Sequence, residues 1–344
     1  MIQRGGWAFP SPALLFLSYA YMNRNPTTPA PRSATADKLF RGGTYLSAGL
    51  VFLAVVGILI ALYIGAWPAL RKFGFGFLTS TDWNPVTEKF GALVAVYGTL
   101  VSSAIAMVIA IPLSFGIALF ITELAPAWLK RPVGTAIELL AAIPSIIYGM
   151  WGLFVFAPFF ADHIQPWITD HTEGIPVLGA LFDGPPLGIG MFTAGLILAI
   201  MVMPFITAVM RDVFEIVPSV LKESAYGLGA TTSEVVVKVV LPYTKVGVLG
   251  GIMLGLGRAL GETMAVTFVI GNAHHLETSL FMPGTTISAT LANEFTEAVG
   301  QIYTSSLMAL GTILFLVTLI VLALGQFLVL RTQAKFVLKP EIIE

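Results

Sequence analysis

The sequence predicts an all-α membrane protein with six transmembrane helices. Hydrophobic residues make up 56% of the 344-residue chain and charged residues only 11%, whereas a soluble domain carries about 25% charged residues. Mean hydropathy is +0.88. The apolar residues form long runs without a period of two, which excludes a transmembrane β-barrel. Helices are then the structure that satisfies the backbone hydrogen bonds in lipid.

Six apolar stretches come near or exceed the roughly 20 residues that a helix needs to cross the hydrocarbon. We predict spans at residues 44–67, 93–120, 135–160, 187–210, 246–270 and 305–330. The organisation predicted around them is a disordered tail (1–42), a first span with its outer loop (43–92), a domain holding the other five spans (93–330) and a second tail (331–344).

The distribution of Lys and Arg predicts the orientation of these spans. Of the 18 such residues, Arg71, Lys72 and Lys89 fall in loops on one side of the membrane, and Arg258 falls inside a span. All the others lie on the opposite side, which is therefore predicted to be cytoplasmic together with both termini and the loop 212–242. The outward loops 161–186 and 271–304 contain no Lys or Arg.

Composition and motifs exclude several classes of protein. The chain has no cysteine, so disulfides and cysteine metal sites are ruled out. The four histidines lack metal-ligand spacing, and the net charge of −1 gives no reason to expect a nucleic-acid partner. Neither a phosphate-binding G-x-x-x-x-G-K-[ST] loop nor a hydrolase motif occurs. We therefore expect a non-enzymatic chain with no catalytic residue, metal or cofactor of its own, and any ATP would be bound by a partner.

The longest ordered polar stretch of the cytoplasmic side is predicted to form two short helices. Pro218 and Ser219 begin the first helix, with Ser219 as N-cap, and Gly229 ends it. Thr231 and Glu234 have the spacing of a capping box, which starts a second helix that runs to Leu241 and meets Pro242. Two interpretations remain open at this point: amphipathic helices that lie on the membrane surface, or a docking surface for another protein.

The spacing of this stretch resembles the EAA loop of ABC importer permeases, which has the pattern EAA–x3–G–x9–I–x–L–P. The matching residues are Glu223, Ser224, Ala225, Gly229, Val239, Leu241 and Pro242, with Ser224 and Val239 as mild departures. The resemblance implies that a coupling helix here seats in a cleft of a cytoplasmic ATPase. It implies coupling roles for Glu223, Ala225, Gly229, Leu241 and Pro242.

The resemblance extends over residues 37 to 330. FLTSTDWNP at 77–85, AIPSIIYGMWGLF at 142–154 and GRALGETMAV at 257–266 are similar to segments of the C-type permease subunit of the bacterial high-affinity phosphate ABC importer. It implies a type I importer fold in the inner membrane and transport of phosphate by alternating access. The implied partners are a homologous A-type permease subunit, a cytoplasmic ATPase dimer, an external phosphate-binding protein and membrane lipid.

Two alternatives to this function remain from the residues alone. Another oxyanion, such as sulfate or molybdate, would suit the same machine. An ion-coupled secondary transporter or a channel is a different class; it would need no two-helix cytoplasmic elbow and more often contains inverted repeats, which we do not find.

The fifth predicted span contains a stripe of small residues that leads to two charges. Gly247, Gly251 and Gly255 recur every four residues and predict close helix packing. Continued by helical spacing, the stripe leads to Arg258 and Glu262, which are therefore predicted to lie on the packed face and to pair. Two roles are open: a structural ion pair, or a substrate pathway in which Arg258 meets a passing anion that Glu262 holds or gates.

The third predicted span contains Pro144. Because proline lacks a backbone donor and clashes with the preceding turn, we predict a kink there. A gate beside a substrate pathway and an ordinary membrane-helix kink are both compatible with this position.

Overall fold

The computed structural model describes residues 34–337. The predicted tail at 1–33 and residues 338–344 lie outside the described residues. The chain divides into two units, 1–58 and 59–344, which are treated separately. Within residues 34–337, six helical segments are long and apolar enough to cross a membrane, which confirms the predicted number of spans.

The described part of the first unit is the beginning of helix α2 (Ala34–Phe73). This helix begins at Ala34 instead of residue 44, so the prediction of disorder is wrong for residues 34–42. The early start has a local cause: Asp37 lies in the first turn, where a negative charge favours the helix dipole.

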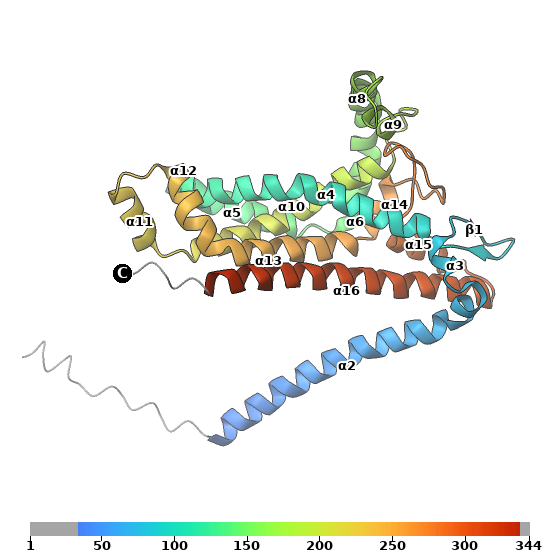
Figure 1. Cartoon of the computed structure of the whole chain (residues 1–344), viewed down its shortest axis with the longest axis horizontal. Coiled ribbons are helices and arrows are strands. Elements are labelled where there is room, and N and C mark those ends of the chain that lie inside the picture. The colour runs from blue at the N-terminus through green and yellow to red at the C-terminus, as the bar shows by residue number, and fades with distance from the viewer. Residues whose placement is uncertain (1–33, 338–344) are drawn as a thin grey trace, which may run out of the picture. The chain divides into compact units, whose positions relative to one another are not determined.

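In the second unit, four long helices form the bundle shown in Figure 1. They are α4 (Leu93–Leu119), α10 (Met191–Glu215), α13 (Leu241–Leu260) and α16 (Gln301–Val337). α10 is the central helix, because 61% of its most apolar window is buried, more than in any other candidate span of the described chain. Its side chains Ile197, Leu198, Ile206 and Met210 are fully buried in the main core.

The third span differs from its prediction, because the helix expected over residues 135–160 is interrupted and the span begins only after the interruption. Helix α5 (Ala127–Ala141) is followed by an extended Pro144, and α6 (Ser145–Trp151) starts immediately afterwards. The helix then continues through η2 (Gly152–Phe156), α7 (Ala157–Phe159), η3 (Phe160–Ile164) and α8 (Gln165–Thr172). Residues 135–160 are therefore not one helix: the chain breaks at Pro144 rather than kinking, and the span is Ser145–Thr172.

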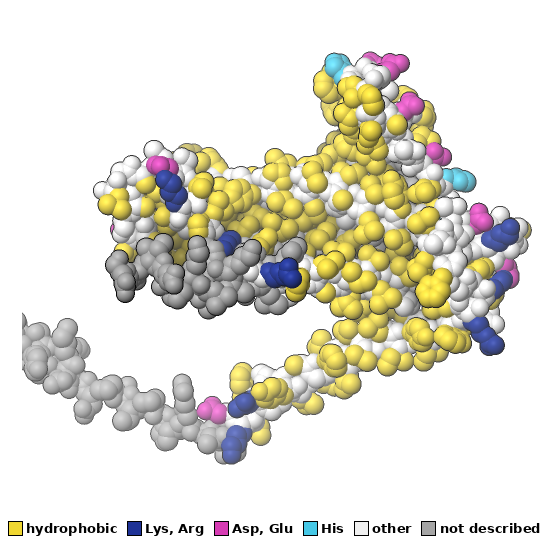
Figure 2. Space-filling view, viewed as in Figure 1, with side chains coloured by type: hydrophobic (Ala, Val, Ile, Leu, Met, Phe, Trp, Pro, Cys, Tyr) yellow, Lys and Arg dark blue, Asp and Glu magenta, His cyan; other side chains and the backbone are white. Residues whose placement is uncertain are grey.

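The ends of the bundle are built from short elements. At one end lie α3 (Gly76–Thr79), a hairpin of β1 (Trp83–Asn84) and β2 (Lys89–Phe90), α9 (Leu178–Leu181), α14 (Met264–Val269) and α15 (Ile287–Glu294). At the other end lie the π-helical turn η1 (Phe120–Leu124), α11 (Ser219–Gly227), α12 (Thr232–Val235) and a second π-helical turn, η4 (Val236–Val240). Apolar side chains cover the middle of the bundle and charged ones gather towards its ends (Figure 2).

Candidate functional site

The first candidate site is the segment 218–242, which we call the elbow. Its first helix, α11, ends at Gly227, and Gly229 follows with a φ of +88°. The amide of Ala230 donates to the Ala225 carbonyl at 3.1 Å, and the amide of Gly229 donates to the Tyr226 carbonyl at 2.9 Å. These two bonds form a Schellman motif, in which glycine is favoured because other residues are strained at positive φ. The predicted end of the helix at Gly229 is thus confirmed.

The start of α11 differs from the prediction. Pro218, with an extended backbone, occupies the N-cap position, and no side chain caps the helix. Ser219 is the first helical residue, and its hydroxyl therefore does not serve as the predicted cap. The fixed φ of proline places the chain correctly for a helix to begin at the next residue.

The second helix of the elbow begins as predicted but does not end at Pro242. Thr231 and Glu234 form the full capping box, with the Glu234 carboxylate accepting from the Thr231 amide at 3.0 Å. From Thr232 the helix continues through η4 into α13, so one span covers Thr232–Leu260. Pro242 lies in the first turn of α13. The wider π-helical turn before it accommodates a residue that has no amide hydrogen to donate.

The elbow has an inner and an outer face. Ala225, Ala230 and Val239 pack against the main core, and Leu241 and Pro242 are half-buried. Glu223 is exposed, and Leu228 is 91% exposed at the tip. The coupling residues predicted from the sequence therefore separate into a packed group (Ala225, Leu241, Pro242) and an exposed group (Glu223, Gly229).

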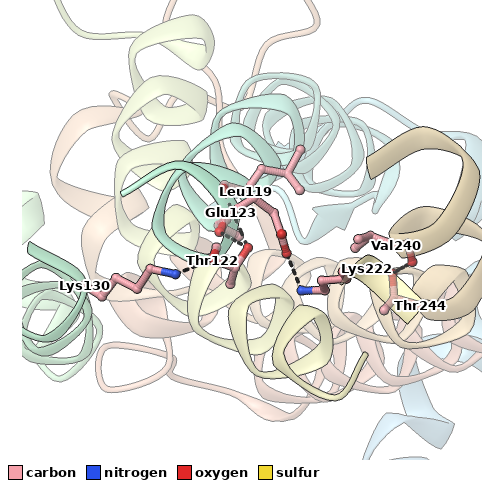
Figure 3. A network of polar contacts seen from close by, with 8 residues as sticks. Leu119, Thr122, Glu123, Lys130, Lys222, Val240 and Thr244 are labelled. Atoms are coloured by element: carbon pink, nitrogen blue, oxygen red, sulfur yellow. Dashed lines mark hydrogen bonds and ion pairs between the residues drawn. The ribbon is translucent and has the colours of Figure 1, made fainter. Parts of the chain in front are cut away.

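One ion pair links the inner face of α11 to the end of α4 (Figure 3). The Lys222 ammonium lies 2.6 Å from a carboxylate oxygen of Glu123 in η1, and the two side chains are only 18% and 6% exposed. In the same π-helical turn, the Thr122 carbonyl accepts from the Lys130 ammonium at 2.6 Å. Sequence analysis missed this pair, because residues 99 positions apart carry no local pattern.

The glycine stripe of α13 packs against α10. A Cβ atom added at Gly247, Gly251 or Gly255 would lie 2.6, 3.0 or 2.5 Å from a side chain of α10. The predicted close packing is thus confirmed, and the seam is filled by a helix of the same chain. A second permease chain therefore does not pack along it.

The predicted ion pair between Arg258 and Glu262 does not form. Helix α13 ends at Leu260 with Gly261 as its C-cap, so the two residues do not share one helix face. Among the described residues, no carboxylate lies within 4.0 Å of Arg258. Its guanidinium is exposed and lies 5.7 Å from the centre of the Phe205 ring on α10. Arg258 is thus not on the packed face; Ala259, which is 3% exposed, continues the glycine stripe.

Glu262 instead stabilises the start of the next helix. Its half-buried carboxylate accepts a hydrogen bond from the Ala265 amide, 3.2 Å away, in the first turn of α14. α14 packs in turn against α6, where a Cβ atom at Gly149 would lie 2.9 Å from Phe268. Glu262 therefore sets the position of a helix that lies beside the break at Pro144.

The break at Pro144 is bridged by Tyr148. The phenol of Tyr148, which is buried, donates a hydrogen bond of 2.9 Å to the Leu140 carbonyl in the last turn of α5. The same phenol lies within electrostatic range of Arg258. The structure thereby brings Arg258, Pro144 and Glu262 into one region, where two helices break: the first before α6 and the second after α13.

A further polar cluster, which sequence analysis missed, holds the opposite end of the bundle together. Glu294 accepts hydrogen bonds from Trp83 Nε1 at 2.7 Å and from the Tyr303 hydroxyl at 2.8 Å, and it pairs with His274 Nε2 at 2.8 Å. Burial by itself raises the pKa of Glu294, but the three donors outweigh it, and the pKa lies below its ordinary value. The cluster joins the hairpin, the 271–286 loop, α15 and α16.

Comparison with known proteins places this architecture among transport proteins. Residues 110–334 match the family described as binding-protein-dependent transport system inner membrane component. The chain is 61% identical over 304 residues to the phosphate transport system permease protein PstC of Mesorhizobium japonicum, covering 88% of this chain and 93% of that one. It is 62% identical over 299 residues to the protein of the same name from Pasteurella multocida, covering 87% and 93%.

Among solved structures, the chain is similar to a crystal structure of a bacterial alginate ABC transporter in complex with an alginate pentasaccharide-bound periplasmic protein. The TM-score is 0.53 at 18% identity, and the match covers 82% of this chain and 92% of that one. At this identity the likeness concerns the fold alone, and it agrees with the predicted helical permease architecture.

Proposed function

Because the chain belongs to the binding-protein-dependent transport system inner membrane components, and within them to the phosphate transport system permeases, we propose that phosphate crosses this subunit past Arg258. The chain is a multi-pass inner-membrane permease of an ABC importer and has no catalytic activity of its own. The observation that carries the proposal is the exposed guanidinium of Arg258 at the end of a membrane span.

The surroundings of Arg258 favour a passing anion over a permanent partner. A charged side chain in a membrane span is costly and is retained where it meets water, protein or substrate. In the described chain the Arg258 guanidinium lies over the Phe205 ring, which does not neutralise its charge. Its planar donors suit two oxygens of one phosphate at once. Glu262, two residues beyond the end of α13, would shape the same region by holding α14.

The elbow is proposed as the surface that receives movement from the ATPase. Family membership implies an ATPase and a binding protein as partners. We assign the ATPase, as a dimer, to the exposed group of the elbow, which displays Glu223 beside the apolar tip residue Leu228. Closure of the ATPase dimer would then push the elbow and rock the helices between inward-open and outward-open states.

The remaining assignments follow from charge and from the number of spans. The Lys and Arg distribution supports cytoplasmic termini, so the phosphate-binding protein would dock at the opposite end, near the hairpin and the 161–186 loop. Six spans are few for a transporter, and a homologous A-type permease subunit would complete the pathway.

Uptake of labelled phosphate by vesicles that contain the full complex tests this function. We expect uptake to require ATP and the binding protein, and to persist in an excess of unlabelled sulfate. Uptake that continues without ATP, or that sulfate abolishes, would overturn the proposed substrate or energy source.

A further inference from the structure

The Lys222–Glu123 ion pair is distinguished by its burial and by what it joins. It is the more buried of the two ion pairs in the elbow: the other, Lys238–Glu234, has side chains that are 71% and 42% exposed. Glu123 lines an apolar groove together with Phe115, Leu119 and Leu124 and with Val236 and Val237 of η4. In such surroundings an ion pair adds little net stability, but it holds its two partners in one geometry, because separating them leaves a buried charge without a partner.

α11 is attached to its neighbours by the backbone at both ends and by packing on its inner face. It joins α10 through the extended Pro218 and α12 through Gly229, whose φ is +88°, and Ala225 packs against the main core. Lys222 adds a polar attachment of fixed geometry. Among the described residues, its bond to Glu123 is the one side-chain hydrogen bond or ion pair that ties α11 to the α4–η1 helix.

Neighbouring residues of α11 thus have different surroundings. Glu223 is exposed on the proposed ATPase surface, whereas Lys222 points inward to Glu123 (Figure 3). Beyond Glu123, α4 runs to the other end of the bundle, where the Thr99 hydroxyl accepts a hydrogen bond of 3.0 Å from the Ile287 amide at the start of α15. Between Glu123 and Thr99 lie 24 residue steps, about 36 Å of helix at 1.5 Å each.

We infer that Lys222 and Glu123 are positioning residues for coupling: their ion pair transfers movement of the elbow to α4, and α4 carries it across the membrane. The inference rests on the proposed function of the elbow as the ATPase surface. α4 itself is fastened to α10, since the Ser114 hydroxyl donates to the Met203 carbonyl at 3.0 Å. A push on α11 would therefore move α4 and α10 together rather than bend the elbow alone.

The first test measures coupling in vesicles that contain the complete importer. Lys222→Glu and Glu123→Lys each place like charges opposite one another. We expect phosphate uptake per ATP hydrolysed to fall in each, because repulsion between like charges breaks the contact between α11 and η1, and to recover substantially in the double swap. The matched control is Glu138→Lys, which reverses one charge of the Arg211–Glu138 pair outside the elbow and should leave this ratio unchanged.

The phosphate taken up per ATP hydrolysed distinguishes a coupling role of the ion pair from a structural one. A merely structural role would lower the amount of assembled complex and leave uptake per ATP unchanged, and that outcome would overturn the inference. If the unaltered importer itself failed to take up phosphate, the proposed function would fall instead, independently of this pair.

The second test needs no transport. Because the chain has no cysteine, spin labels placed at the exposed positions Val220→Cys and Leu124→Cys report the distance between α11 and η1. We expect one narrow distance distribution, the same with and without nucleotide, and a broader one when Lys222→Met is added. Equal distributions with and without Lys222→Met would contradict a fixed attachment.

Discussion

Arg258 faces the ring of Phe205 at 5.7 Å, and no carboxylate of the described residues lies within 4.0 Å of it. The sequence predicted that Arg258 and Glu262 form a pair, whereas the structure gives the two residues different surroundings. Arg258 has no carboxylate partner among the described residues, whereas Glu262, four positions later, accepts a hydrogen bond from the first turn of α14.

The hydrogen bond between the Ala265 amide and Glu262 makes a testable prediction. Glu262→Gln keeps an oxygen that accepts from the Ala265 amide, so we expect an unfolding temperature close to that of the unaltered chain. Glu262→Ala loses the acceptor, and we expect a loss of about 0.5–2 kcal/mol in unfolding free energy. Thermal and denaturant unfolding of the purified permease measure both. If Gln proved as destabilising as Ala, the charge rather than the hydrogen bond would be the important feature.

The glycine seam predicts opposite effects for two substitutions on one helix. Gly255→Ala would place a methyl group 2.5 Å from Ile206, and we expect a loss of about 1–3 kcal/mol in unfolding free energy. A methyl group at Gly250 would meet nothing within 4 Å beyond its own helix, so Gly250→Ala should be neutral or stabilising by up to about 1 kcal/mol. Denaturant unfolding of the isolated subunit compares the two, and similar destabilisation by both would rule out the seam as the cause.

The exposed tip of the elbow predicts a loss of ATPase binding. Leu228 is 91% exposed, so Leu228→Glu should leave the fold of this chain unchanged but reduce the ATPase that co-purifies with it about tenfold or more, as for a contact at the centre of an interface. Val299→Glu is the matched control, because Val299 is 87% exposed and lies just before α16, at the opposite end of the bundle. Undiminished co-purification of the ATPase with Leu228→Glu would place the docking surface elsewhere.

The Glu294 cluster predicts a dependence of stability on pH. The pKa of Glu294 is lowered in the folded chain. The contribution of Glu294 to stability is therefore present above its pKa in the unfolded chain, about 4.3, and is lost as pH falls through its pKa in the folded chain. We expect Glu294→Gln to lower the melting temperature at pH 7 and to make a diminishing difference below about pH 4. Glu297→Gln, an exposed neighbour, should behave like the unaltered chain at both pH values. If the difference in melting temperature between Glu294→Gln and the unaltered chain did not shrink in acid, the lowered pKa of Glu294 would not be the cause.

Local sequence patterns correctly predicted those helix starts and ends that depend on neighbouring residues. The capping box at Thr231 and the helix end at Gly229 are confirmed because neighbouring residues alone decide them. One error also has a local cause: α13 ends at Leu260 with Gly261 as its C-cap, and α14 begins only at Met264. Apolar composition had made residues 246–270 look like one continuous helix.

Features that depend on distant residues were not predictable in this way. Lys222 and Glu123 are 99 positions apart, and Trp83 and Glu294 are 211 apart, so neither pair leaves a periodic trace in the sequence. The π-helical turn before Pro242 was missed because proline there predicts a helix end, whereas a widened turn lets the helix continue.

Uptake of labelled phosphate by the Arg258→Gln importer tests the central claim most directly, with the amount of assembled complex measured in the same vesicles. The account predicts that the complex assembles normally and that uptake is abolished, because glutamine cannot supply the positive charge. Uptake at the normal rate by the assembled Arg258→Gln complex would contradict a place for Arg258 on the phosphate route.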